Sequence, residues 1–301
     1  MNHRPPFRFH QLDVFTATPL LGNPLAVVHA AQGLTEAQMA AFARWTNLSE
    51  TTFLLPPTRL EADYRVRIFT PVAELPFAGH PTLGSCFAWL AAGGQAHSAT
   101  QVVQECGVGL VRVRRSAELG PQRLAFAAPP LRRTGPLDDA TLRQIERALA
   151  LQVGDVLHHQ WVDNGPGWCA VMLRSAQQVL ALKPDFAALG ALKLGVIAPQ
   201  LPGAETQFEV RAFVPALSVP EDPVTGSLNA GLAQWLIGAG LASTQYVAAQ
   251  GTALGRAGRV YVQQEGADAC ADVCADVCAD VCADVWVGGD VVICVDGQVS
   301  L

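Results

Sequence analysis

The sequence predicts an α+β fold made of two similar domains. The chain has 301 residues, and at about 150 residues per domain this length indicates two domains. Segments that alternate apolar and polar residues, which is typical of half-buried strands, are interleaved with two largely apolar helical segments. The composition is 50 % apolar and only 15 % charged, so it is that of a folded protein and excludes disorder.

An internal repeat supports the two-domain organisation. The block RIFTP at 67–71 resembles RAFVP at 211–215, and HPTLGS at 80–85 resembles DPVTGS at 222–227. An apolar helix is expected after each second block, and the two pairs of blocks have nearly the same separation. Each half therefore repeats a strand, a loop and an apolar helix in the same order. A helix that is apolar on all its faces must be covered by sheet to bury them.

The elements of the first half follow from local patterns. Thr35 and Gln38 form a capping box for a helix that extends to about Trp45. A second helix is expected at 83–92, because Pro81 suits a first helical turn and Gly93 suits a helix end. Strands are expected at 7–16, 25–29, 51–55, 64–70, 103–114 and 123–126.

The second half is expected to begin after Pro129-Pro130, which lies near the midpoint. This gives domains at 1–129 and 130–301, with the last strand, about 287–301, returning to the first domain. Within the second domain we expect helices at 140–150 and 223–238 and a strand at 168–173.

Charge and targeting signals limit the partners. The net charge is −6 and the chain contains no run of Lys or Arg, so nucleic acid and anionic membranes are not expected as partners. No signal-peptide pattern and no apolar run of about 18 residues is present, so we expect no membrane span and a cytoplasmic protein with reduced thiols.

The two repeated helix starts indicate a seat for carboxylates. A helix N-terminus leaves backbone N–H groups unpaired and carries partial positive charge. Small residues allow a ligand to approach that backbone closely, and the candidates are Gly84, Ser85, Gly226 and Ser227.

His80 and Asp222 would lie at the lip of such a seat, one from each domain. An acid/base pair there would act on a bound anion. The alternative remains open that Asp222 is an ordinary helix N-cap and His80 a hydrogen-bonded loop histidine.

Several blocks resemble the phenazine-biosynthesis PhzF-like family, which shares the fold of diaminopimelate epimerase. They are DVFT at 13–16, GNP at 22–24, NLSETTF at 47–53, FTP at 69–71, FAGHPTLG at 77–84, EDPVTGS at 221–227, QG at 250–251 and GR at 255–256. The resemblance implies two pseudo-symmetric epimerase-like domains, each a strongly bent, mostly antiparallel sheet or barrel around a central helix. It also implies an active-site cleft between them and, usually, a homodimer.

The resemblance further implies a reaction and its residues. Glu50 corresponds to the family's acid/base, which moves a proton within a small carboxylate-bearing substrate and needs no cofactor or metal. His80 and Asp222 would polarise the substrate or shuttle the proton. Gly79, in the same block as His80, would bind the substrate, and Ser227 would bind a substrate carboxylate or hydroxyl.

Two other classes of function are weighed against this isomerase. An amino-acid racemase or epimerase on the same fold needs one cysteine on each side of the substrate. Here Cys86 lies inside the predicted helix and has no counterpart in the second domain. A non-catalytic member that binds small acids, or regulates, is the other alternative.

Residues 270–285 are four copies of Cys-Ala-Asp-Val. We expect this tract to extend a hairpin between 258–264 and 286–295, or to form an irregular loop. A metal site is the less favoured interpretation, because zinc ligands usually come as separate pairs that fold around the ion.

Overall fold

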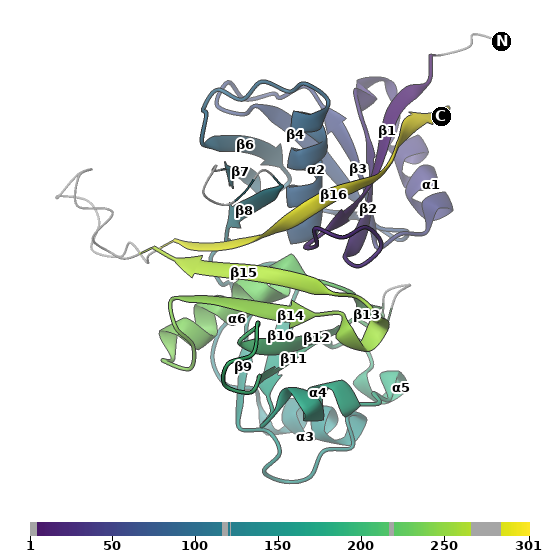
Figure 1. The fold of residues 1–301 in the computed structure, drawn as a ribbon. Helices are drawn as coiled ribbons and strands as arrows, with labels where there is room; N and C mark the ends of the chain where they lie inside the picture. Colours follow the sequence, from purple (N-terminus) through teal and green to yellow (C-terminus); the bar gives the residue numbers. More distant parts are fainter. Residues whose placement is uncertain (1–4, 116–119, 121, 217–219, 266–283) are drawn as a thin grey trace.

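The computed structural model describes residues 5–115, 120, 122–216, 220–265 and 284–301, which form two stacked lobes of bent sheet (Figure 1). Apart from its last two residues, the Cys-Ala-Asp-Val tract lies outside these ranges. The interpretations of the tract therefore stay predictions. The segments expected to flank it do pair as neighbouring antiparallel strands.

The N-terminal lobe is a closed barrel. In order around the barrel, its strands are β1 (Phe7–Val14), β2 (Asn23–Val28), β3 (Glu50–Leu55), β4 (Tyr64–Phe69), β6 (Gln101–Cys106), β7 (Gly109–Arg115), β8 (Arg123–Ala127) and β16 (Val285–Val299). β16 pairs with both β8 and β1, which closes the ring. Most pairs are antiparallel, but β2 with β3 and β4 with β6 are parallel.

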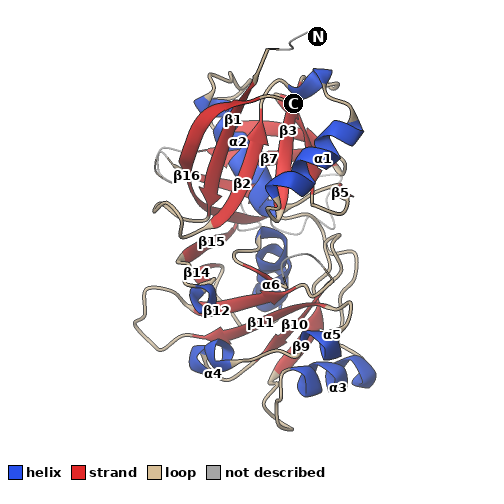
Figure 2. Ribbon diagram, turned by 90° about the vertical axis from the view of Figure 1, so that its right-hand side faces the viewer, coloured by secondary structure: helices blue, strands red, loops and turns tan. Residues whose placement is uncertain are grey.

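Helix α2 (Gly79–Ala91) fills this barrel (Figure 2). Its sequence contains no Asp, Glu, Lys or Arg, and it packs against β1, β2, β3, β8 and β16. Leu83 is fully buried there, and its burial alone contributes about 1.5–3 kcal/mol. The predicted apolar helix inside a sheet is therefore confirmed in this lobe.

The C-terminal lobe continues the same sheet from β16. Its strands are β15 (Gly258–Gln264), β14 (Gln245–Gln250), β12 (Phe208–Phe213), β11 (Lys193–Pro199), β10 (Trp168–Met172) and β9 (His158–Trp161). Helix α6 (Gly226–Gly238) packs against β10, β15 and β16 and is buried over most of its length.

The remaining helices cover the outside. Helix α1 (Glu36–Thr46) packs on β3 and β4, and its predicted capping box is confirmed. Helices α3 (Asp139–Ala148), α4 (Ala176–Ala181) and α5 (Phe186–Leu189) form a second apolar cluster with the outer face of β10 and β11. In the described ranges, no helix is long and apolar enough to cross a membrane.

The internal repeat corresponds to a repeated structure. β4 pairs with the short strand β5 (Glu74–Leu75) antiparallel and with β6 parallel, and α2 lies between β5 and β6 in sequence. β12 pairs in the same way with β13 (Glu221–Asp222) and β14, with α6 between them. The α+β class with two pseudo-symmetric halves is thus confirmed.

The detailed match of the two halves differs from the one that the sequence suggested. The sequence blocks align His80 with Asp222, but in the structure the helices begin at Gly79 and Gly226. His80 therefore lies in the first turn of α2, whereas Asp222 lies in β13, before α6. Three residues separate the short strand from the helix in each half, but the connection between β12 and β13 is longer than the one between β4 and β5. The sequence blocks do not reveal this difference.

Two element boundaries also differ from expectation. The segment 103–114 is a hairpin of β6 and β7 with a turn at 107–108, and the predicted helix at 223–238 begins only at Gly226. Thr225 is its N-cap and has an extended backbone, so the preceding residues belong to the loop. β16 is shared: Val285–Asp290 pairs with β15 and β8, and Val291–Val299 pairs with β1.

Candidate functional site

A pocket of about 340 Å³ lies between the two lobes, within the size range of small-molecule sites. Ser49, Glu50 and Ala78 line it from the N-terminal lobe. Asp222 and Ser227 are among the residues that line it from the C-terminal lobe. Most of its remaining wall is apolar.

The starts of α2 and α6 meet at this pocket. A β-carbon on Gly79 would lie 2.7 Å from the Cα of Gly226, and one on Gly226 would lie 2.9 Å from the Cα of Gly79. Only glycine allows this approach. Within the described residues, neither Ala78 nor Thr225 caps its helix through its side chain, and both line the pocket. Two partially positive helix ends therefore converge there.

Glu50 is the first residue of β3. Asn47 ends α1 in the left-handed conformation, which turns the chain into the strand, and Glu50 pairs in register with Leu25 of β2. Only 14 % of its side chain is exposed. Burial raises the pKa of Glu50 to about 8, and the negative charge of Asp222 adds to this shift.

His80 faces Glu50 from the first turn of α2. The distance between His80 Nε2 and Glu50 Oε2 is 3.4 Å. Burial lowers the pKa of His80 to about 3, so at neutral pH its imidazole is uncharged. The contact thus joins a neutral imidazole to a carboxyl that is mostly protonated, and it is not an ion pair. His80 is buried, unlike the lip position that we expected.

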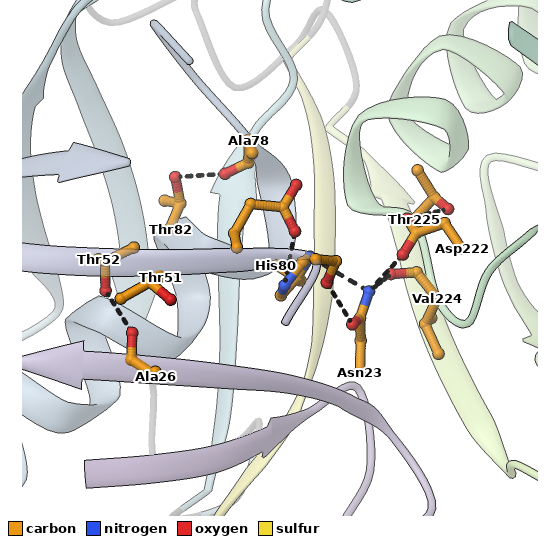
Figure 3. Close-up of polar contacts among 12 residues, drawn as sticks. Asn23, Ala26, Thr51, Thr52, Ala78, His80, Thr82, Asp222, Val224 and Thr225 are labelled. Carbon is orange, nitrogen blue, oxygen red and sulfur yellow. Dashed lines mark hydrogen bonds and ion pairs between the residues drawn. The ribbon is translucent and has the colours of Figure 1, made fainter. Parts of the chain in front are cut away.

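Asn23, in β2, connects the two lobes at the centre of the site (Figure 3). Its Nδ2 donates to Asp222 Oδ1 and to the carbonyl oxygen of Val224, both at 2.8 Å. The same Nδ2 lies 3.3 Å from Nδ1 of His80, so Asn23 touches His80 as well as the other lobe.

Asp222 is held by hydrogen bonds from both lobes. Thr225 Oγ1 donates to its Oδ2 at 2.6 Å, and Asn23 donates to its Oδ1. Burial raises the pKa of Asp222 to about 6, although these two hydrogen bonds oppose the shift. Asp222 is not the N-cap of α6, since that position belongs to Thr225.

Ser227 is buried in the first turn of α6. Trp168 Nε1 donates to its Oγ at 3.0 Å, and Asn164 Nδ2 donates to its carbonyl oxygen at 2.8 Å. Because Trp168 already supplies a hydrogen to this oxygen, the Ser227 hydroxyl keeps its own hydrogen available as a donor.

Gly84 and Ser85 are not brought to the pocket. A β-carbon on Gly84 would lie 2.5 Å from Leu25 Cδ2, and Ser85 Oγ donates to Thr52 Oγ1 at 2.9 Å. Both contacts are with the barrel wall. Because α2 begins at Gly79, these two residues lie in its second turn, too deep to touch a ligand at the helix start.

The structure does not support the racemase or epimerase alternative, which needs a cysteine on each side of the substrate. Among the described cysteines none lines the pocket, and Cys86 is fully buried in α2 with a pKa that burial raises. The helix starts carry His80 and Ser227 next to their glycines.

Sequence reasoning missed several residues of this site. Asn23 lies in the GNP block at 22–24, but the resemblance implied no role for it. Asn164, Trp168 and Lys193 also contribute to the pocket, and no motif in the sequence marks them. Only the packing of the second lobe brings them there.

The chain matches a known family over most of its length. A family model described as phenazine biosynthesis-like protein (PhzC-PhzF) matches residues 12–274. The chain is 35 % identical to antisense-enhancing sequence 1 of Schizosaccharomyces pombe, across 96 % of this chain and 97 % of that protein. It is 36 % identical to trans-2,3-dihydro-3-hydroxyanthranilate isomerase of Pseudomonas chlororaphis, across 85 % of this chain and 89 % of that enzyme.

Solved structures share the fold. A PhzF-family protein of Bacillus anthracis has a TM-score of 0.80 at 20 % identity, covering 99 % of this chain and 100 % of that one. One from Enterococcus faecalis has a TM-score of 0.77 at 25 % identity, with the same coverage. A hydroxyproline epimerase from Agrobacterium vitis has a TM-score of 0.60 at 13 % identity, covering 100 % of this chain and 94 % of that one, so it is similar in fold alone.

Proposed function

The chain belongs to the PhzC-PhzF family of phenazine biosynthesis-like proteins, and on that premise we propose that it is an isomerase which moves a proton within a small carboxylate-bearing substrate. In this proposal Glu50 is the acid/base, and the inter-lobe pocket is the active site.

The observation that carries the proposal is that two buried carboxyls, Glu50 and Asp222, line the same pocket in environments that separate their pKa values. The pKa of Glu50 is about 8 and that of Asp222 is about 6, so at neutral pH Glu50 mostly holds a proton and Asp222 mostly does not. Two neighbouring carboxyls with separated pKa values are typical of acid/base assignments in enzymes. A pKa near the working pH lets Glu50 both take and return a proton.

The helix starts at Gly79 and Gly226 would hold the substrate carboxylate. Their uncapped N–H groups and the free donor hydrogen of Ser227 face the same pocket. A substrate held by its carboxylate at the helix starts would have an acidic carbon close to Glu50.

The reaction is a proton shift with no net change in the enzyme. Ionised Glu50 removes a proton from an acidic carbon, and the electron pair left behind delocalises into the adjacent unsaturated or carbonyl group. Glu50, now protonated, returns the proton to another atom of the same molecule. The neutral His80 imidazole and the Asp222 carboxylate would polarise the substrate or carry the proton between its two positions.

Exchange with solvent deuterium tests this mechanism. The first substrate to try is trans-2,3-dihydro-3-hydroxyanthranilate, the acid in the name of the Pseudomonas relative. We expect the wild type to isomerise it in D₂O with deuterium detectable by mass spectrometry. Glu50→Gln should fold normally but lose turnover by about 10²–10⁴-fold, the usual contribution of general acid/base catalysis.

Glu36→Gln is the matched control, because it makes the same side-chain replacement at an exposed residue of α1, outside the pocket. It should keep wild-type turnover. Wild-type-like turnover in Glu50→Gln would refute the assignment of Glu50. Binding of small acids without any exchange in the wild type would instead favour the non-catalytic alternative.

A further inference from the structure

The inter-lobe pocket contains two cationic side chains that the proton shift does not use. Lys193 is the first residue of β11 and is half-buried, and it is one of only two lysines in the chain. Arg132 lies in the connection between β8 and α3 and is more exposed. Both line the pocket from the C-terminal lobe.

Both cations border the same stretch of the pocket wall, residues 163–168. Lys193 pairs in register with Trp168. The backbone N–H of Arg132 donates to the carbonyl oxygen of Asp163 at 2.6 Å. A β-carbon on Gly165 would lie 3.9 Å from the guanidinium carbon of Arg132, so this side chain lies over the glycine.

The described residues provide neither cation with an ion-pair partner. Burial lowers the pKa of Lys193, and the charge of Asp163 is the strongest influence that opposes this shift. The Oδ1 of Asp163, however, accepts the N–H groups of Gly165 and Gly167 at 2.7 Å each. Asp163 therefore braces its own loop and does not itself line the pocket.

The charge of the pocket is opposite to that of the whole protein. The net charge of the chain is −6. At neutral pH, Asp222 is mostly ionised, because its pKa is about 6. Burial keeps Glu50 mostly protonated and His80 neutral. Among the side chains that line the pocket, two cations thus stand against one ionised carboxylate, and the two helix starts add further positive potential.

We propose that Lys193 and Arg132 form a second anion subsite in this pocket, so that the pocket prefers small acids with two anionic groups over acids with one carboxylate. The inference rests on the proposed function for the first seat, at the helix starts. The second group would bind the ammonium and guanidinium on the wall at 163–168, and the two anchors together would fix which carbon of the substrate faces Glu50.

Binding of simple ring acids tests the subsite without turnover. The probes are benzoate, with one carboxylate, and isophthalate and terephthalate, each with two. Their affinities are measured by titration calorimetry at pH 7. We expect at least one diacid to bind the wild type about 10-fold or more tightly than benzoate, as a charge-assisted contact allows.

Variants locate the effect. Lys193→Met and Arg132→Met should each remove most of the diacid preference while leaving benzoate affinity within about 2-fold of wild type. The matched controls are Lys183→Met and Arg143→Met, which remove exposed cations of the same lobe outside the pocket. Both should keep the preference.

Two results would overturn the subsite. The first is equal wild-type affinity for benzoate and both diacids. The second is a loss of benzoate affinity in Lys193→Met as large as the loss for the diacids, which would place the single carboxylate at Lys193. Glu50→Gln should retain the diacid preference. If the preference exists but Glu50→Gln still isomerises, the proposed function fails and the subsite stands.

Discussion

At the scale of single residues, Asn23 connects the two lobes at the site through its side-chain amide. Its amide has two hydrogens, and its two shortest contacts, at 2.8 Å, are with Asp222 and the Val224 carbonyl oxygen in the other lobe. Its Oδ1 accepts from Ser49, the neighbour of Glu50, at 3.2 Å. One side chain therefore binds the Asp222 carboxyl directly and the residue next to Glu50.

Replacement of Asn23 by alanine should change both stability and pH dependence. Loss of its hydrogen bonds leaves buried acceptors unpaired, which costs about 1–3 kcal/mol in free energy of unfolding. Because the hydrogen bond from Asn23 lowers the pKa of Asp222, its removal should raise that pKa above about 6. Asp222 would then ionise at higher pH, and the acidic limb of kcat/KM should move upward.

The measurement is the pH profile of kcat/KM for Asn23→Ala and wild type, together with thermal unfolding. The two apparent pKa values in the profile belong to the coupled carboxyls and not to single residues. An unchanged acidic limb would contradict the role given to Asn23.

At the scale of elements, the contact between the starts of α2 and α6 fixes the position of one lobe relative to the other. The two backbones meet at Gly79 and Gly226, where a β-carbon has no space. Gly238, at the end of α6, has no atom within 4 Å of a β-carbon position and is a matched helical glycine.

Gly79→Ala should therefore separate the two helix starts. Overpacking typically costs about 1–3 kcal/mol, and here the neighbour that must move is backbone. We expect a lower melting temperature together with a large loss of kcat/KM. Gly238→Ala should be neutral or stabilising by up to about 1 kcal/mol, as alanine favours helix. Equal behaviour of the two variants in thermal unfolding and turnover would contradict this view of the contact.

At the scale of the whole molecule, the seam between β1 and β16 closes the N-terminal barrel. A chain of polar contacts crosses it from the exposed Asp296 to two buried histidines: Asp296 Oδ1 lies 3.1 Å from His10 Nε2, and His10 Nδ1 lies 3.2 Å from His29 Nε2. Arg8 also contacts Asp296, at 3.5 Å. Burial lowers the pKa of His10, and it lowers that of His29 to about 4 with a contribution from His10.

These histidines should make stability depend on pH. The unfolded chain protonates His29 near pH 6.5, before the folded protein does, so the unfolded state binds more protons between about pH 6.5 and 4. The free energy of unfolding should fall as the pH is lowered through this window, by at most about 3 kcal/mol from His29. His29→Gln should flatten that dependence in denaturant titrations at a series of pH values.

The matched control is His158→Gln, which removes an exposed histidine in β9. It should retain the wild-type pH dependence. If the free energy of unfolding of His29→Gln depends on pH as it does in the wild type, His29 does not titrate in this window. The expected homodimer also belongs to this scale, and the mass in solution tests it.

Local patterns were enough to establish much of this protein. Alternation, capping and helix-breaking residues identified most strands and both central helices, because these signals depend on neighbours a few residues apart. The repeat predicted two similar halves, and the family resemblance singled out Glu50, His80, Asp222 and Ser227, which line or adjoin one pocket in the structure.

Tertiary structure alone decided which groups meet. In the folded protein Gly79 contacts Gly226, and Lys193 lines the pocket. Gly84 and Ser85 pack from α2 against the barrel wall. Tertiary structure also shifted the pKa values of Glu50 and Asp222, because burial comes from segments distant in sequence. Contacts between such segments depend on how two lobes pack, and no short pattern in the chain encodes that packing.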